Sequence, residues 1–389
     1  MVTPKANPES AIELPSPKSD CSVSSQLPET QLKLELDITT AIQTVQQPGN
    51  EQEKRRCVRV PDLFSSIMAA KPVVNSNYFQ VKPEGDRWIG QIMNMDEKAS
   101  DRNTRADLCY MASIWSPTSN EEALRMMLDW NHWVILFDDQ FDEGHLKNDL
   151  VAAQAEIDAT MAIMTDDAPL IKPSENPIRY VFQTCWQRLK RRASLELQQR
   201  FREQHRRYFE QLAAQVQRAA SGEVLMTDVD TYMEMRRGTI GVYPAIALSE
   251  YGHEIKLPEH IFSHSSLQEC MRVSTDLVLL VNDLLSYRKD LELGFNYNLI
   301  SIPQQNGLSI QHSIDQIGAM MTDCYRRWYM ALVELPSYGQ EIDSEVLKFV
   351  DVCRFVALGK LHWSFKSGRY LGNEGYGVYK TKILPLFRE

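Results

Sequence analysis

Residues 128–146 form an apolar, aromatic-rich run that ends in a cluster of acidic and amide side chains. No proline or glycine interrupts the run between Leu128 and Glu143, so it predicts a helix. At about 3.6 residues per turn, Asp138 and Asp142 share one face of that helix. Carboxylates crowded at the negative C-terminal end of a helix repel one another, so the pattern favours a bound divalent cation.

A second apolar stretch, residues 276–292, also ends in polar side chains. Asn282, Ser286 and Asp290 follow one another at four-residue intervals, so they point broadly the same way from a helix. Their amide, hydroxyl and carboxylate oxygens are hard ligands of the kind that Mg²⁺ prefers. Lys289 adds positive charge beside the same spot.

Taken alone, each stretch also fits an ordinary structural role. Acidic clusters often mark solvated helix ends, and a row of polar residues often marks a helix face. Two such stretches on separate apolar helices can, however, face each other across the cavity of a helical bundle, a usual place for a metal site. We therefore interpret them jointly as one metal site with ligands from both helices.

The chain from about residue 60 onward has a helical pattern. Apolar residues recur at three- and four-residue spacing in the segments 122–138, 195–220, 267–293, 314–335 and 343–363. The sequence lacks the alternating patterns between hairpin turns that mark strands. It therefore predicts an all-α protein with one helical domain over residues 61–389. Residues 1–60 are rich in proline, serine, glutamine and glutamate, and we predict a disordered N-terminal extension there.

Composition narrows the class of protein further. A formal net charge of −10 over 389 residues argues against a nucleic-acid partner. The seven cysteines are dispersed without paired spacing, which is typical of reduced thiols. No apolar run approaches the length of a membrane span, and no basic-then-apolar leader opens the sequence. We expect a cytoplasmic protein without a membrane span.

The acidic string at 138–142 and the polar series in 276–292 resemble the two metal motifs of class I terpene synthases. These are the aspartate-rich motif and the Asn/Ser/Glu triad, here with aspartate in the third place of the triad. Residues 368–370, Gly-Arg-Tyr, resemble the C-terminal Arg-Tyr pair of the family. The resemblance spans roughly residues 75–375 and is strongest toward microbial and fungal sesquiterpene cyclases.

The segment 234–244 resembles the diphosphate sensor of the same family. Arg236 and Arg237 are consecutive there and point about 100° apart on a helix, so only one can face a shared site. We favour Arg236 as the sensor. Gly241 and Pro244 predict a break or kink in this helix, and freed backbone carbonyls there could point at a carbocation, as the resemblance suggests.

The resemblance implies a single class I terpenoid synthase-like α-helical bundle around a central apolar cavity. It implies an enzyme, a carbon–oxygen lyase that uses Mg²⁺ to ionise and cyclise farnesyl diphosphate to a sesquiterpene hydrocarbon or alcohol, with release of diphosphate. By the same resemblance, three Mg²⁺ ions are held by Asp138, Asp142, Asn282, Ser286 and Asp290. The diphosphate is held by Arg236, Lys289, Arg369 and Tyr370. The expected catalytic residues among these are Arg236, Arg369 and Tyr370. A monomer or a homodimer is expected.

After ionisation, a hydrocarbon cation needs a dry cavity whose aromatic faces stabilise charge without acting as nucleophiles. Phe137, Trp115 and Trp363 are candidates for that wall. Trp363 is favoured because it precedes Arg369 by six residues, where the family often has an aromatic. The sequence departs from the family at Val134 and Ile135, where relatives often carry aromatic side chains.

Three other functions remain open at this point. A diterpene cyclase acting on geranylgeranyl diphosphate would share every motif. A chain-elongating prenyl transferase would share the first motif, but those enzymes typically carry a second aspartate-rich motif in place of the Asn/Ser/Asp series. A non-catalytic helical protein that binds isoprenoid diphosphates would keep the shape without the turnover.

Overall fold

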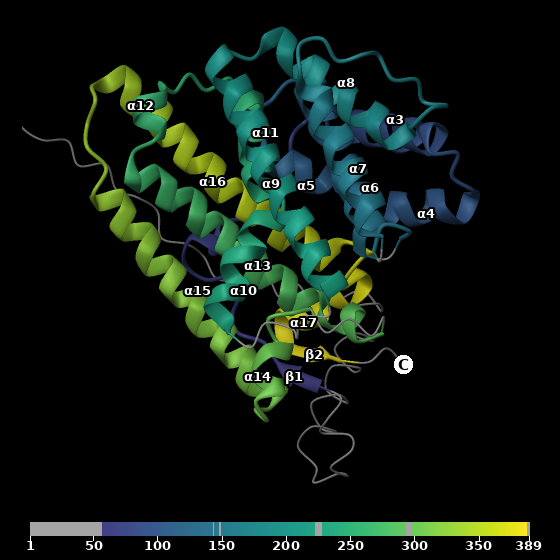
Figure 1. Cartoon of the computed structure of the whole chain (residues 1–389). Coiled ribbons are helices and arrows are strands. Elements are labelled where there is room, and N and C mark those ends of the chain that lie inside the picture. Colours follow the sequence, from purple (N-terminus) through teal and green to yellow (C-terminus); the bar gives the residue numbers. More distant parts are fainter. Residues whose placement is uncertain (1–56, 143, 148, 222–227, 293–296, 387–389) are drawn as a thin grey trace, which may run out of the picture. The chain divides into compact units, whose positions relative to one another are not determined.

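The computed structural model describes residues 57–142, 144–147, 149–221, 228–292 and 297–386, which belong to one compact unit, residues 55–389 (Figure 1). Nothing is described for the side chains of Asp142, Ala219 and Ala220. The α-helices are α3 Tyr78–Ile92, α4 Glu97–Ala106, α5 Leu108–Trp115, α6 Glu121–Asp142, α7 Leu150–Met161, α8 Pro177–Arg192, α9 Leu195–Ser221, α10 Val229–Thr239, α11 Val242–Gly252, α12 Glu259–Phe262, α13 Ser265–Glu292, α14 Ser301–Gln305, α15 Ile310–Val333, α16 Gln340–Lys366 and α17 Gly375–Thr381. The other elements are the 3-10 helices η1 Ser66–Ala69, η2 Ala162–Met164 and η3 Gly372–Glu374 and the strands β1 Cys57–Arg59 and β2 Ile383–Pro385.

The segments predicted from periodicity correspond to α6, α9, α13, α15 and α16, with ends that agree within four residues. The start of α6 illustrates why these ends are readable from sequence. Asn120 Oδ1 accepts a hydrogen bond from the Ala123 backbone N–H at 2.9 Å, and Glu121 and Glu122 place negative charge in the first turn. The all-α prediction is confirmed for the described residues.

The predicted break after Arg237 is also present. Helix α10 ends at Thr239, and α11 begins at Val242. Gly241 between them has φ +73°, a left-handed conformation that glycine adopts without the steric cost of a side chain. Because the chain turns there, the ends of both helices reach the same enclosed space.

Helix α13 lies in the middle of the helices that form the site. It packs against α10, α11, α15 and α16, while α16 also packs against α5 and α11. Helix α6 packs against α5, α8 and α11 on the other side (Figure 1). Since α13 is lined with buried side chains for most of its length, it can carry polar groups into an otherwise apolar interior.

Strands β1 and β2 form a small antiparallel ladder in which Cys57 pairs with Pro385. Val60 continues it, its N–H donating to Lys382 O at 2.8 Å. Residues 57–60, which the sequence analysis assigned to the N-terminal extension, are therefore ordered against the C-terminal strand. The prediction of disorder for the residues before 57 falls outside the described part. Of the described helices, none is long and apolar enough to cross a membrane.

Helices α5 and α16 pack closely at Gly359. An alanine Cβ there would lie 2.5 Å from Trp115 Cδ1, which is too close, and 3.2 Å from Met111 O, which is a tight contact. We expect Gly359→Ala to lower the free energy of unfolding by about 1–3 kcal/mol, because Trp115 or the helix must shift. Urea denaturation would measure it. Gly377→Ala, whose Cβ meets nothing within 4 Å, is the control and should not destabilise; equal losses in both variants would contradict the prediction.

Candidate active site

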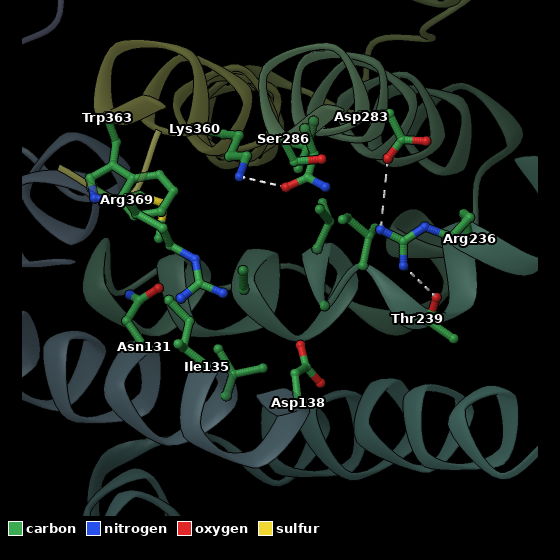
Figure 2. Close-up of a pocket in the computed structure, with 18 of the residues that line it drawn as sticks. Asn131, Ile135, Asp138, Arg236, Thr239, Asp283, Ser286, Lys360, Trp363 and Arg369 are labelled. Carbon is green, nitrogen blue, oxygen red and sulfur yellow. Dashed lines mark hydrogen bonds and ion pairs between the residues drawn. The ribbon is translucent and has the colours of Figure 1, made fainter. Parts of the chain in front are cut away.

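One cavity of about 250 Å³ brings together the two predicted metal motifs. Figure 2 shows its polar residues reaching inward from α6, α10, α13 and α16. The apolar lining residues are Met111, Trp115, Trp130, Val134, Ile135, Ile240, Val242, Ala245, Val278, Val356 and Trp363. Oxygen-bearing and cationic side chains share the same space, namely Asn131, Asp138, Asp139, Gln215, Thr239, Asn282, Asp283, Ser286, Asp290, Tyr297, Tyr370, Arg236, Lys289, Lys360 and Arg369.

The acidic end of α6 supplies one side of the polar region. Asp138 accepts a hydrogen bond from the Tyr208 hydroxyl of α9, which fixes one of its oxygens. Asp139 accepts from the Arg369 guanidinium at 3.3 Å. The predicted ligand Asp142 is the last residue of α6, but its side chain lies outside the described residues.

Helix α13 supplies the facing side. Ser286 Oγ donates to Asp290 Oδ2 at 2.8 Å, and Asn298 Nδ2 donates to the same carboxylate at 2.8 Å. Burial raises the pKa of Asp290 above its usual value, since the charged form loses water. A half-buried carboxylate of this kind gains from a nearby cation.

The donor set fits a hard divalent ion. Carboxylate, amide and hydroxyl oxygens from α6 and α13 open onto one cavity, and such oxygens suit Mg²⁺ better than a soft metal. No group of three His, Cys, Asp or Glu side chains close enough to hold a metal occurs in the described ranges. A site here would therefore depend on Asn282 and Ser286 as well as on carboxylates.

Arg236 lines the cavity, and two neighbours orient it. It donates to Thr239 Oγ1 at 3.0 Å and lies 3.9 Å from Asp283 Oδ1. Asp283 is itself buried and accepts from the Tyr232 hydroxyl at 2.6 Å and from the Leu299 backbone N–H at 3.0 Å. These bonds fix the Asp283 carboxylate beside Arg236.

Arg237 has a different environment. It donates to Asp276 Oδ1 at 2.6 Å, and Asp276 is 1% exposed. Arg327 of α15 binds the other oxygen of Asp276 at 2.5 Å. Of the two consecutive arginines, Arg236 therefore lines the cavity, whereas Arg237 ties α10 to α13 and α15.

Lys360 of α16 is a buried cation that the sequence analysis missed. Its Nζ donates to Asn282 Oδ1 at 2.8 Å and lies 4.6 Å from the Tyr370 ring centroid and 4.8 Å from that of Trp363 (Figure 2). Burial lowers the pKa of Lys360. Burial alone would raise the pKa of Tyr370, but the Lys360 and Arg369 cations outweigh it and lower that pKa. Two basic side chains, Lys360 and Arg369, therefore act on Tyr370 in this corner of the cavity.

The consecutive residues Arg288 and Lys289 have different surroundings. Lys289 lines the cavity, whereas Arg288 donates to Glu374 Oε2 at 2.5 Å and to the Tyr370 backbone oxygen at 3.2 Å. Arg288 therefore holds the segment that carries Arg369 and Tyr370 against α13.

The aromatic wall differs from the prediction at Phe137. That ring is fully buried and packs between α6 and α9, with centroids 5.6 Å from Phe209 and 5.2 Å from Trp133. The ring points toward α9, so Phe137 does not line the cavity, whereas the next residue, Asp138, does. Trp115 and Trp363 do line the cavity.

Comparison with known proteins decides the family. Residues 129–327 match the family model "Terpene synthase family 2, C-terminal metal binding". The chain is 42% identical over 330 residues to (+)-eremophilene synthase of Gibberella fujikuroi, covering 85% of this chain and 92% of that one. It belongs to the terpene synthase family.

A second relative and a solved structure support the same family assignment. It is 44% identical over 337 residues to (1R,4R,5S)-(-)-guaia-6,10(14)-diene synthase of Fusarium proliferatum, covering 84% of each chain. A crystal structure of a-eudesmol synthase superposes with a TM-score of 0.68 over 77% of this chain and 98% of that one, at 20% identity, which shows the shared fold. The protein is thus a class I terpene synthase of the fungal type, a lyase acting on isoprenoid diphosphates with a divalent metal.

Signals for the missed residues of the synthase differ in strength. Lys360 interrupts the apolar run 355–361, and a lysine in such a run is a recognisable anomaly. Asn131 lies seven positions before Asp138, close to two helical turns, so it shares that face. Asp283 carries no comparable signal, because its contacts with Tyr232 and Leu299 come from distant parts of the chain.

Proposed function

We propose that this synthase ionises farnesyl diphosphate and cyclises the C15 chain to a sesquiterpene, releasing diphosphate. The observation that carries the proposal is the mixed lining of one cavity. Hard oxygen donors and cations from α6, α10, α13 and residues 369–370 line it together with indole and aliphatic side chains. A substrate with a charged head and a hydrocarbon tail matches that lining.

The diphosphate would bind at the polar end. Asp138, Asp142, Asn282, Ser286 and Asp290 would hold the metal, proposed to be three Mg²⁺ ions. Bound Mg²⁺ supplies Lewis-acid stabilisation of the departing diphosphate. Arg236, Lys289 and Arg369 would place positive charge on the same group, and the Tyr370 hydroxyl would donate a hydrogen bond to it. Lys360 adds a further cation beside Tyr370.

The hydrocarbon part would lie along the apolar wall. Trp115 and Trp363 are buried and line the cavity, and their indole rings would stabilise a carbocation without capturing it, the Trp363 ring sharing its place with the Lys360 ammonium at 4.8 Å. The other apolar lining residues exclude water from the reacting chain. Both hydrocarbon and alcohol products fit this arrangement.

Cavity size favours the shorter substrate. About 250 Å³ is small beside the range of roughly 300–1,000 Å³ typical of small-molecule sites. A C15 chain therefore fits better than the C20 chain of geranylgeranyl diphosphate, the alternative substrate.

Incubation of the purified protein with farnesyl and geranylgeranyl diphosphates, with Mg²⁺ or with EDTA, tests the proposal. We expect a cyclic C15 product that requires Mg²⁺, read by gas chromatography and mass spectrometry, and matching release of pyrophosphate. A C20 product alone would mean that geranylgeranyl diphosphate is the substrate and that the proposed chemistry still applies. A folded protein that releases no pyrophosphate from either substrate would favour the binding-protein alternative.

A further inference from the structure

Asn131 is a buried amide on the cavity face of α6. Its side chain is 1% exposed and lines the cavity. Asp138 follows seven residues later, roughly 10 Å further along the helix axis at about 1.5 Å per residue. Asn131 therefore lies about two turns away from the acidic end of α6. Val134 and Ile135, both apolar, line the cavity between them.

The orientation of the amide is fixed by its nitrogen. Asn131 Nδ2 donates to the Met127 backbone oxygen at 2.8 Å, one turn back on the same helix. Only the nitrogen end of an amide can donate, so Oδ1 occupies the opposite position. Figure 2 shows that oxygen turned from α6 toward the enclosed space.

The oxygen has no protein partner within the described residues. Asn131 Oδ1 is buried and accepts no hydrogen bond there. The Arg369 guanidinium, which also lines the cavity, donates to Asp139 instead. Burying an amide oxygen without a partner costs free energy, which leucine at this position would avoid. A ligand with positive charge at this depth would offset that cost.

We propose that Asn131 is a specificity-determining residue whose carbonyl dipole stabilises positive charge on the hydrocarbon chain, about two helical turns from the diphosphate end. The interaction is ion–dipole, with no bond formed or broken at Asn131. In a site closed to water, a fixed dipole acts strongly on charge that develops near it. Asn131 then favours those cations whose charge lies at its end of the cavity, and so biases which product leaves. This inference rests on the proposed cyclisation.

Two substitutions separate the dipole from the shape of the residue. Asn131→Leu removes the carbonyl and keeps a branched side chain of similar outline, although a bulkier one, and Asn131→Ala removes both the carbonyl and the volume. With farnesyl diphosphate and Mg²⁺, we expect both variants to lower the share of the principal wild-type product by about tenfold, the size of one lost electrostatic contact. Pyrophosphate release should fall much less, because ionisation takes place at the other end.

Gln183→Leu is the matched control. Gln183 is a buried amide on α8, bonded to Pro169 O at 2.7 Å and outside the cavity. It should lose stability in thermal denaturation and keep the wild-type product ratio.

The outcomes are distinguishable. A shift in Asn131→Ala with an unchanged ratio in Asn131→Leu would mean that shape acts and the dipole does not, which overturns the inference. Unchanged ratios in both variants would also overturn it. If Asn131→Leu fails to fold, a wild-type ratio in Asn131→Ala overturns the inference by itself. Failure of the proposed function is a separate result, because the wild-type protein would then release no pyrophosphate.

Discussion

Ser286→Ala is expected to lower the rate of pyrophosphate release from farnesyl diphosphate by at least about a hundredfold while the protein stays folded. The hydroxyl of Ser286 is a proposed metal ligand and donates to Asp290 at 2.8 Å. Its loss removes one oxygen from the proposed metal site and leaves Asp290 less well oriented. The variant should also need more Mg²⁺ to reach half of its own maximal rate, because losing a ligand and the hydrogen bond that orients Asp290 weakens metal binding.

Ser274→Ala controls for the loss of a buried hydroxyl on the same helix. Ser274, like Ser286, is buried, and it donates to Cys353 O at 2.6 Å, away from the cavity. Both variants should lose about 1 kcal/mol of stability, but only Ser286→Ala should lose turnover. If the turnover of Ser286→Ala stayed within about threefold of wild type, the loss would be far smaller than that expected for a metal ligand. Ser286 would then not be part of the metal site.

Arg236→Met should mainly lower turnover, whereas Arg237→Met should mainly lower stability. Arg236 lines the cavity, so its loss should lower turnover by about a hundredfold or more, with little change in the denaturation midpoint. Arg237 binds the buried Asp276, so its loss should lower the free energy of unfolding by about 2–3 kcal/mol. The effect stays at the lower end for a buried pair because Arg327 still binds Asp276.

Steady-state kinetics and urea denaturation of the two arginine variants would check this. The turnover is to be expressed per folded molecule. If Arg237→Met lost turnover while Arg236→Met kept it, the two roles would have to be exchanged. Comparable losses of turnover in both variants would mean that the Arg237–Asp276 pair also supports the geometry of the active site.

The helices and the order of the motifs were predictable because both depend on short-range pattern. Periodicity located α13, and a four-residue interval placed Asn282 and Ser286 on one face. Phe137 was proposed for the cavity wall as an aromatic residue beside Asp138, but its ring packs against Phe209 of α9 instead. Asn131, with the better spacing, was overlooked.

What sequence could not supply is the pairing across helices. Lys360 meets Asn282 only because α16 packs on α13, and its contact spans 78 positions. Asp283 looks like one more polar residue in its stretch until Tyr232 and Leu299 are seen to bind it. Side chains that act through such partners have no local signature, because packing between distant helices decides where they point.

The ladder between β1 and β2 has a consequence for protein engineering. Because Cys57 pairs with Pro385, the two ends of the described chain are already neighbours. A short linker could join them, and new termini could open in the exposed turn at 172–175, between η2 and α8. Such a circular permutant would leave α6, α13 and α16 uncut. The cavity therefore depends on how these helices pack and not on their order along the chain.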